Sequence, residues 1–119
     1  MENPFAQETK PTSAWLWQVF TGVGLVVLLG LHFVANHFVA KGGLRDFSEV
    51  VAYLRNPVIL CLEVLFLFCV TTHALLGVRA IFLDFGLSEP AERRLNQILK
   101  LAGVLTIGYG LGVTWIVIR

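Results

Sequence analysis

The sequence predicts an all-α integral membrane protein with three transmembrane helices packed in a bundle. The first observation is composition: 56% of the 119 residues are hydrophobic and 14% are charged, with a mean hydropathy of +0.76. The second is distribution, because the charges gather in a few clumps. A soluble domain of this size must cover its surface with polar groups, so a soluble enzyme and a disordered chain are disfavoured. A net charge of +1 does not indicate the strongly basic surface that binds nucleic acid.

Three stretches are long enough to cross a bilayer, which takes roughly 20 apolar residues in a helix. We expect the spans at about residues 14–38, 58–83 and 100–118. No formal charge lies between Lys10 and Lys41, and the second stretch opens after Asn56-Pro57. Backbone groups in lipid must be satisfied within the segment, so these spans are helices rather than strands.

The other segments are short connectors within a single domain, residues 1–119. Residues 43–54 carry apolar side chains at helical spacing, which predicts an amphipathic helix in the membrane interface. Ser88 and Pro90 predict a helix start ahead of the third span. The first eleven residues lack the basic start of a cleaved signal peptide. Five basic residues on the N-terminal side against four on the other favour a cytoplasmic N-terminus.

His73 is the most informative ionisable residue, because such groups are costly inside a membrane and usually functional. It shares a helix face with Gly77 and Ala80, whose small size leaves room for a flat macrocycle bound to the imidazole. Arg79, nearer the water, can pair with a carboxylate such as a haem propionate. Alternatively, His73 bonds a neighbouring helix and the small residues serve close packing. Spacing alone leaves both interpretations open.

His32 lies about 25 Å along the first helix from Trp15, so it sits at a different depth from His73. The two histidines are therefore poorly placed to bind one haem together, and each could serve its own. Polar packing between helices explains His32 equally well. We expect Glu63 to be reached by water or by Arg55.

Other features favour ordinary membrane roles. Trp15 and Trp17 are typical of the aromatic belt at the interface, and His37 is best explained as a solvated side chain. Gly108 and Gly112 form a G-x-x-x-G face that lets another helix approach closely. Internal packing and a partner contact both remain open for that face.

The run from His73 to Gly86 reads HALLGVRAIFLDFG. It resembles the H-x-x-x-G-x-R…D-x-G signature of the cytochrome b membrane anchors of succinate dehydrogenase and fumarate reductase. Chains of that family have about this length, three spans, a cytoplasmic N-terminus and a short amphipathic piece after the first span.

The resemblance implies a non-catalytic subunit of succinate:quinone oxidoreductase in a bacterial inner membrane. Such an anchor pairs with a second anchor subunit and binds one or two haems b within the helical bundle. It also docks a flavoprotein subunit and an iron–sulfur subunit. Electrons from succinate then reach a quinone bound beside the anchor.

The resemblance also implies roles for individual residues. His73 becomes an axial ligand of haem b iron, and Arg79 lies near the haem propionates. His32 matches the histidine that binds the outer haem in two-haem members. Asp84 becomes a candidate for the quinone pocket.

Two further quinone candidates lie in the first helix, where Gln18 to Gly22 resembles a degraded R-x-[ST]-G stretch. They are Trp17 and Thr21. The family's first-helix arginine is absent, with Gln18 or Val19 in its place.

Ala80 stands where the family's first anchor often has a second histidine, which favours the D-type anchor or a divergent C-type. Phe85 is a departure from the D-type chains, in which a tyrosine often follows the aspartate. An anchor of quinol:fumarate reductase or of another haem b dehydrogenase is the main alternative. A small structural membrane protein without a cofactor is the second.

Overall fold

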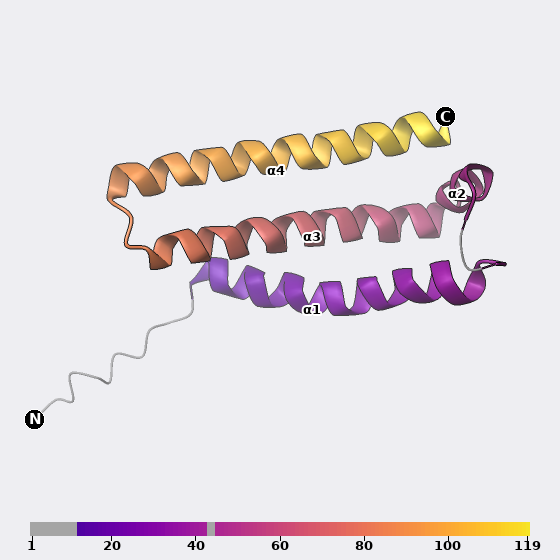
Figure 1. The fold of residues 1–119 in the computed structure, drawn as a ribbon, viewed down its shortest axis with the longest axis horizontal. Coiled ribbons are helices and arrows are strands. Elements are labelled where there is room, and N and C mark those ends of the chain that lie inside the picture. The colour runs from indigo at the N-terminus through magenta and orange to yellow at the C-terminus, as the bar shows by residue number, and fades with distance from the viewer. Residues whose placement is uncertain (1–11, 43–44) are drawn as a thin grey trace, which may run out of the picture.

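A computed structural model describes residues 12–42 and 45–119 of the chain. Helix α1 (Ser13–Val34) continues into a short π-helical segment, η1 (Ala35–Val39), and is followed by α2 (Phe47–Leu54), α3 (Pro57–Asp84) and α4 (Glu89–Ile118) (Figure 1). In these ranges the chain forms no strand, and α1 with η1, α3 and α4 are long and apolar enough to cross a membrane. The predicted all-α class with three such helices is confirmed.

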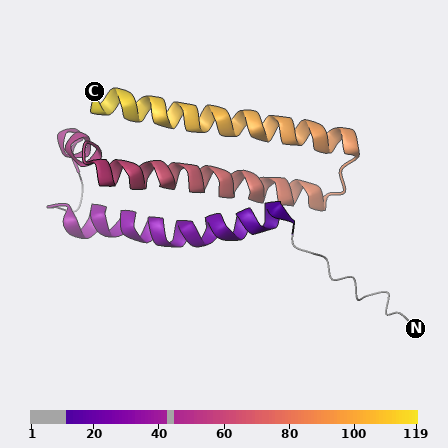
Figure 2. The same cartoon turned by 180° about the vertical axis from the view of Figure 1, so that it is seen from behind.

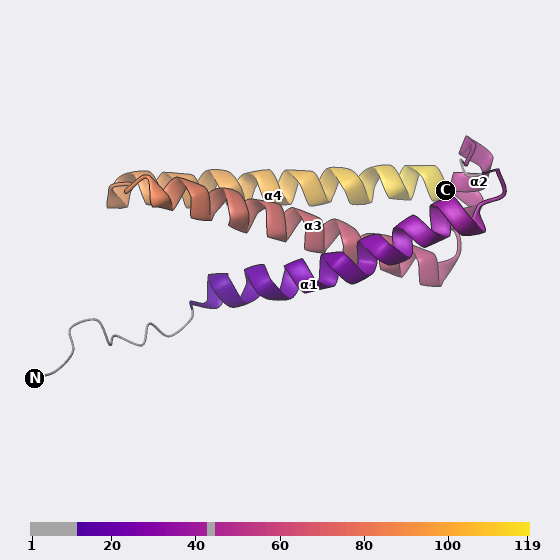
Figure 3. The same cartoon turned by 60° about the horizontal axis from the view of Figure 1, so that its bottom comes forward.

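The three long helices lie side by side with α3 in the middle (Figures 1 and 2). Helix α1 crosses α3 at an angle, as the tilted view shows (Figure 3). Among the described residues α1 and α4 share no contact, while α2 packs across the ends of α3 and α4.

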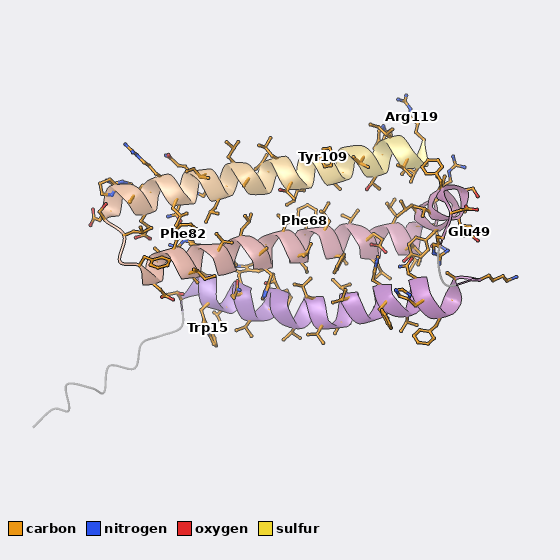
Figure 4. All side chains as sticks on the ribbon, in the orientation of Figure 1. Trp15, Glu49, Phe68, Phe82, Tyr109 and Arg119 are labelled. Atoms are coloured by element: carbon orange, nitrogen blue, oxygen red, sulfur yellow. The ribbon has the colours of Figure 1, made fainter. Side chains whose placement is uncertain are left out.

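The described residues bury no hydrophobic side chain, and aromatic residues such as Trp15 and Tyr109 are exposed on opposite helices (Figure 4). In water this exposure would be prohibitive, whereas lipid solvates apolar faces and leaves helix association to close packing. The exposed apolar faces are therefore suited to contact with lipid.

Local sequence signals explain where each helix begins. Thr12 accepts a hydrogen bond from the Trp15 backbone N–H. Asn56 accepts from two N–H groups of α3, with Pro57 next in line. Such caps satisfy backbone donors that a helix start leaves free. Ser88 precedes α4 as predicted, although its side chain makes no capping bond.

The helix bounds add two details to the sequence-based expectations. Helix α4 begins at Glu89, about three turns before the apolar stretch that follows Lys100. In the expected interfacial segment, α2 begins at Phe47 behind a capping box of Asp46 and Glu49. Residues 43–44 of that segment lie outside the described residues, as do residues 1–11, on which the signal-peptide interpretation rests.

Candidate functional site

The imidazole of His73 projects from α3 onto one turn of α1. Its Nδ1 lies 3.1 Å from the Gln18 carbonyl oxygen and 3.3 Å from the Thr21 hydroxyl. The Thr21 hydroxyl donates to the Trp17 carbonyl at 2.7 Å, so its hydrogen is already engaged. A carbonyl oxygen only accepts, so a hydrogen bond between these two atoms requires the ring proton on Nδ1. In that tautomer Nε2 is the ring nitrogen left as a ligand or acceptor.

Glycine makes this close approach of the two helices possible. A Cβ at Gly22 would lie 3.1 Å from Cε1 of His73. The space beside Gly77 is filled from α1, because a Cβ there would lie 3.3 Å from Nε2 of Gln18. The Gln18 amide thus lies beside Gly77, where the sequence analysis expected room for a macrocycle.

A cleft of about 290 Å³ opens beside this contact, at the end of α3. Its walls include Trp15 and Gln18 from α1 and Arg79 and Asp84 from α3. The side-chain oxygen of Gln18 is buried there with no partner among the described residues. A buried amide oxygen without a donor is costly, so this oxygen lacks a partner that the described residues do not supply.

The three residues predicted to bind quinone lie differently with respect to this cleft. Asp84 is exposed on its rim. Thr21 is 4% exposed and bonds to His73. Trp17 does not line the cleft: its carbonyl accepts from Thr21, and its indole is 57% exposed and packs edge-on against Phe20.

Arg79 is turned toward α4, away from the side of α3 that carries His73. Its Nη2 lies 3.0 Å from the Glu92 carboxylate, and its Nε donates to Asn96 at 2.8 Å. Six positions along a helix correspond to about 120° around its axis, which explains the divergence from His73. The sequence analysis did not identify Glu92 or Asn96, although both precede the third span at helical spacing.

His32 belongs to a second polar cluster at the opposite end of the helices. Its Nδ1 lies 2.9 Å from the Glu63 carboxylate, and its ring stacks on Phe66 with centroids 5.5 Å apart. The Tyr53 hydroxyl donates to the same Glu63 oxygen at 2.9 Å. The expected Arg55 contact is wrong, because Arg55 donates to the Ile118 carbonyl instead.

Burial and the Glu63 carboxylate both raise the pKa of Tyr53. Arg45 stacks over its ring, 4.3 Å from the centroid, and donates to Asn36 in η1. This cluster therefore ties α1, α2 and α3 together. It lies about 16 Å along α1 from the His73 contact, since Thr21 and His32 are eleven residues apart.

The glycines of α4 differ in what they face within the chain. Gly103 and Gly110 face α3, where an added Cβ would lie 2.8 Å from Leu75 and 2.7 Å from Leu67. At Gly108 and Gly112 an added Cβ would meet nothing within 4 Å among the described residues. The G-x-x-x-G face is not used in packing between the described helices.

No group of three or more metal-binding side chains occurs in the described part of the chain. Haem iron does not require one, because the macrocycle supplies four of its ligands and the protein only the axial ones.

Comparisons with a family model and with individual known proteins point to the same family. The model of a family described as succinate dehydrogenase/fumarate reductase transmembrane subunit matches residues 5–110. A succinate dehydrogenase hydrophobic membrane anchor subunit of Archaeoglobus fulgidus is 35% identical over 111 residues, covering 93% of this chain and 94% of that protein. One from Thermoplasma acidophilum is 32% identical over 102 residues, covering 86% and 83%.

Proposed function

The chain belongs to the family of succinate dehydrogenase/fumarate reductase transmembrane subunits, and on this premise we propose that it is a haem b-binding membrane anchor of succinate:quinone oxidoreductase. It is a multi-pass membrane protein with three apolar helices. In the proposed complex it breaks no substrate bond itself. It holds haem and quinone within electron-transfer reach of the iron–sulfur subunit.

The arrangement of His73 carries the haem proposal. Histidines that bind a metal usually donate their other ring N–H to a carbonyl or carboxylate, which fixes the tautomer and the ring orientation. His73 has this arrangement through Nδ1 and the Gln18 carbonyl, so Nε2 is the proposed ligand atom. Haem b would supply a one-electron carrier at this position. We retain Arg79 as the partner of a propionate, although its guanidinium is engaged with Glu92.

His32 is the proposed ligand of a second haem. Its Nδ1 contact with the Glu63 carboxylate is the same kind of support that His73 receives from a carbonyl. Polar packing between α1 and α3 is the competing explanation. Each haem would take its opposite ligand from a partner anchor, because His32 and His73 lie at different depths.

The cleft beside Gln18 and Asp84 is the proposed contribution to the quinone site. Quinone oxygens accept hydrogen bonds, and quinol hydroxyls donate them. The Gln18 amide offers both a donor and its unpartnered oxygen, while the exposed Asp84 carboxylate at the rim offers an acceptor. Thr21 would act on this site through His73. Trp17 is the weaker candidate, because its indole faces outward.

The anchor role requires partners. We propose a second anchor subunit beside α1 and α3, with the flavoprotein and iron–sulfur subunits docked at the end that carries Asp84. That end would be cytoplasmic, together with the N-terminus. Both named relatives are subunits of succinate dehydrogenase, which favours succinate oxidation over fumarate reduction.

A dithionite-reduced difference spectrum of the complex purified from its native membrane tests the haem assignment. We compare His73→Ala and His32→Ala with His37→Ala, which removes the remaining histidine of the chain as a matched control. Loss of the α-band with His73→Ala, while the control keeps it, supports ligation.

The size of each loss separates the alternatives. Half the band lost in each of the first two variants indicates two haems. No effect of His32→Ala makes His32 a packing residue. A complex that assembles without any haem band refutes both ligand assignments.

A further inference from the structure

A groove of about 390 Å³ runs between α3 and α4, on the opposite side of α3 from the His73 contact. Its inner walls are almost entirely apolar and include Leu75, Leu99 and Ile107. Its mouth carries Arg79, Asn96 and Lys100. The groove is therefore amphipathic along its length.

Among the residues that the structure describes, the mouth of the groove offers one positive charge without an ion-pair partner. The Glu92 carboxylate, 3.0 Å away, neutralises Arg79. Lys100 forms no ion pair with any described residue. The Asn96 oxygen accepts from Arg79, so the NH₂ group of Asn96 remains a donor. A lysine ammonium beside an amide N–H suits a singly charged phosphate ester.

The depth of the groove limits what can fill it. From Lys100 to Ile107 the helix advances about 10 Å, whereas the hydrocarbon core is about 30 Å thick. A transmembrane helix of a partner would need a groove through both leaflets. A lipid chain in one leaflet, with its phosphate at the level of Lys100, matches the length.

We propose that the α3–α4 groove binds one anionic phospholipid, with its acyl chain along the apolar wall and its phosphate held by Lys100 and Asn96. Basic pockets between transmembrane helices bind anionic headgroups in this manner. Arg79 at its mouth is also the proposed propionate partner, but Lys100 and Asn96, which would hold the phosphate, have no role in the proposed haem and quinone sites. Substitutions at Lys100 therefore test the lipid site separately from the haem ligands.

Native mass spectrometry of the assembled complex, titrated with phosphatidylglycerol or phosphatidylcholine of identical chains, measures the preference. We expect phosphatidylglycerol to bind more tightly to the wild type. Lys100→Gln should weaken it about five-fold, the equivalent of roughly 1 kcal/mol for one lysine. Lys100→Arg should keep the preference.

Arg94→Gln is the matched control, because it removes the same charge about 120° around α4 at a residue that does not line the groove. We expect it to leave the preference unchanged. If Lys100→Gln and Arg94→Gln weakened phosphatidylglycerol binding equally, the preference would come from general surface charge, and the proposal would be overturned. No preference in the wild type would overturn it as well.

Two further experiments test the acyl chain and the phosphate of the bound lipid separately. Thr72→Phe adds bulk to the groove wall and should abolish the tight phosphatidylglycerol peak while the complex stays assembled. Inorganic phosphate at millimolar concentration should not displace the lipid. Displacement by phosphate, or an unchanged lipid peak in Thr72→Phe, would show that the apolar groove takes no part.

Discussion

The contact between Gly22 and His73 allows a quantitative test of the central geometry. In Gly22→Ala the new methyl group would lie 3.1 Å from Cε1 of His73, while carbon atoms prefer about 3.5–4.0 Å. The ring must therefore recede by about 0.4 Å or more. The Nδ1 to Gln18 oxygen distance, now 3.1 Å, then passes the normal range of about 2.7–3.2 Å.

The expected energies follow from these distances. Weakening the Nδ1–H bond costs about 1 kcal/mol, and alanine in place of a helical glycine contributes about 1 kcal/mol of stability. Gly22→Ala should therefore be nearly neutral. Gly30→Ala is the control on the same helix, because an added Cβ there meets nothing within 4 Å. It should stabilise the chain by about 1 kcal/mol.

Unfolding in mixed micelles gives the free energies of both variants, and the ¹⁵N resonances of the His73 ring report its hydrogen bond. We expect a shifted Nδ1 resonance in Gly22→Ala alone. If Gly22→Ala stabilises as much as Gly30→Ala and leaves the resonance unmoved, the ring does not rest on this turn of α1. The support for Nε2 as the ligand atom would then be lost.

Three other predictions concern the rest of the chain. Tyr53→Phe removes a donor from Glu63 and should cost about 1 kcal/mol, measured by thermal unfolding; an unchanged midpoint would argue against this bond. Gly110→Ala brings a methyl within 2.7 Å of Leu67 on α3; overpacking of about 1–3 kcal/mol, less about 1 kcal/mol of helix propensity, should destabilise the chain by up to about 2 kcal/mol, whereas Gly108→Ala should stabilise it in the absence of a partner. Hydrogen bonds from the Glu49 N–H and the Ser48 hydroxyl hold the pKa of Asp46 below its usual value, so its cap on α2 should be complete at neutral pH and be lost as acid protonates the carboxylate. Amide hydrogen exchange in α2 should therefore accelerate below about pH 4, near the ordinary Asp pKa. Asp46→Asn should abolish that pH dependence.

Much of the architecture could be read from the sequence because it depends on local chemistry. Long uncharged stretches in lipid have to satisfy their own backbone, so the number of spanning helices follows from hydropathy. Helix starts are equally local: Asn56-Pro57 and Ser88 stand where α3 and α4 begin.

The partners of the polar side chains could not be predicted in this way. Nothing near Glu63 in the sequence indicates that it pairs with His32 rather than Arg55, since that choice depends on the relative depth of two helices. The amide of Gln18 fills the space beside Gly77 for the same reason.

The sequence alone determined that three helices cross the membrane, where most of them begin, and that His73 stands at membrane depth. Only the tertiary structure decided which faces meet: His73 against the turn of α1, Arg79 against Glu92, and Gly103 and Gly110, rather than Gly108 and Gly112, against α3. The physical reason is that a helix specifies the spacing of its own side chains. Its rotation and height beside a neighbour are set by packing summed over the whole contact.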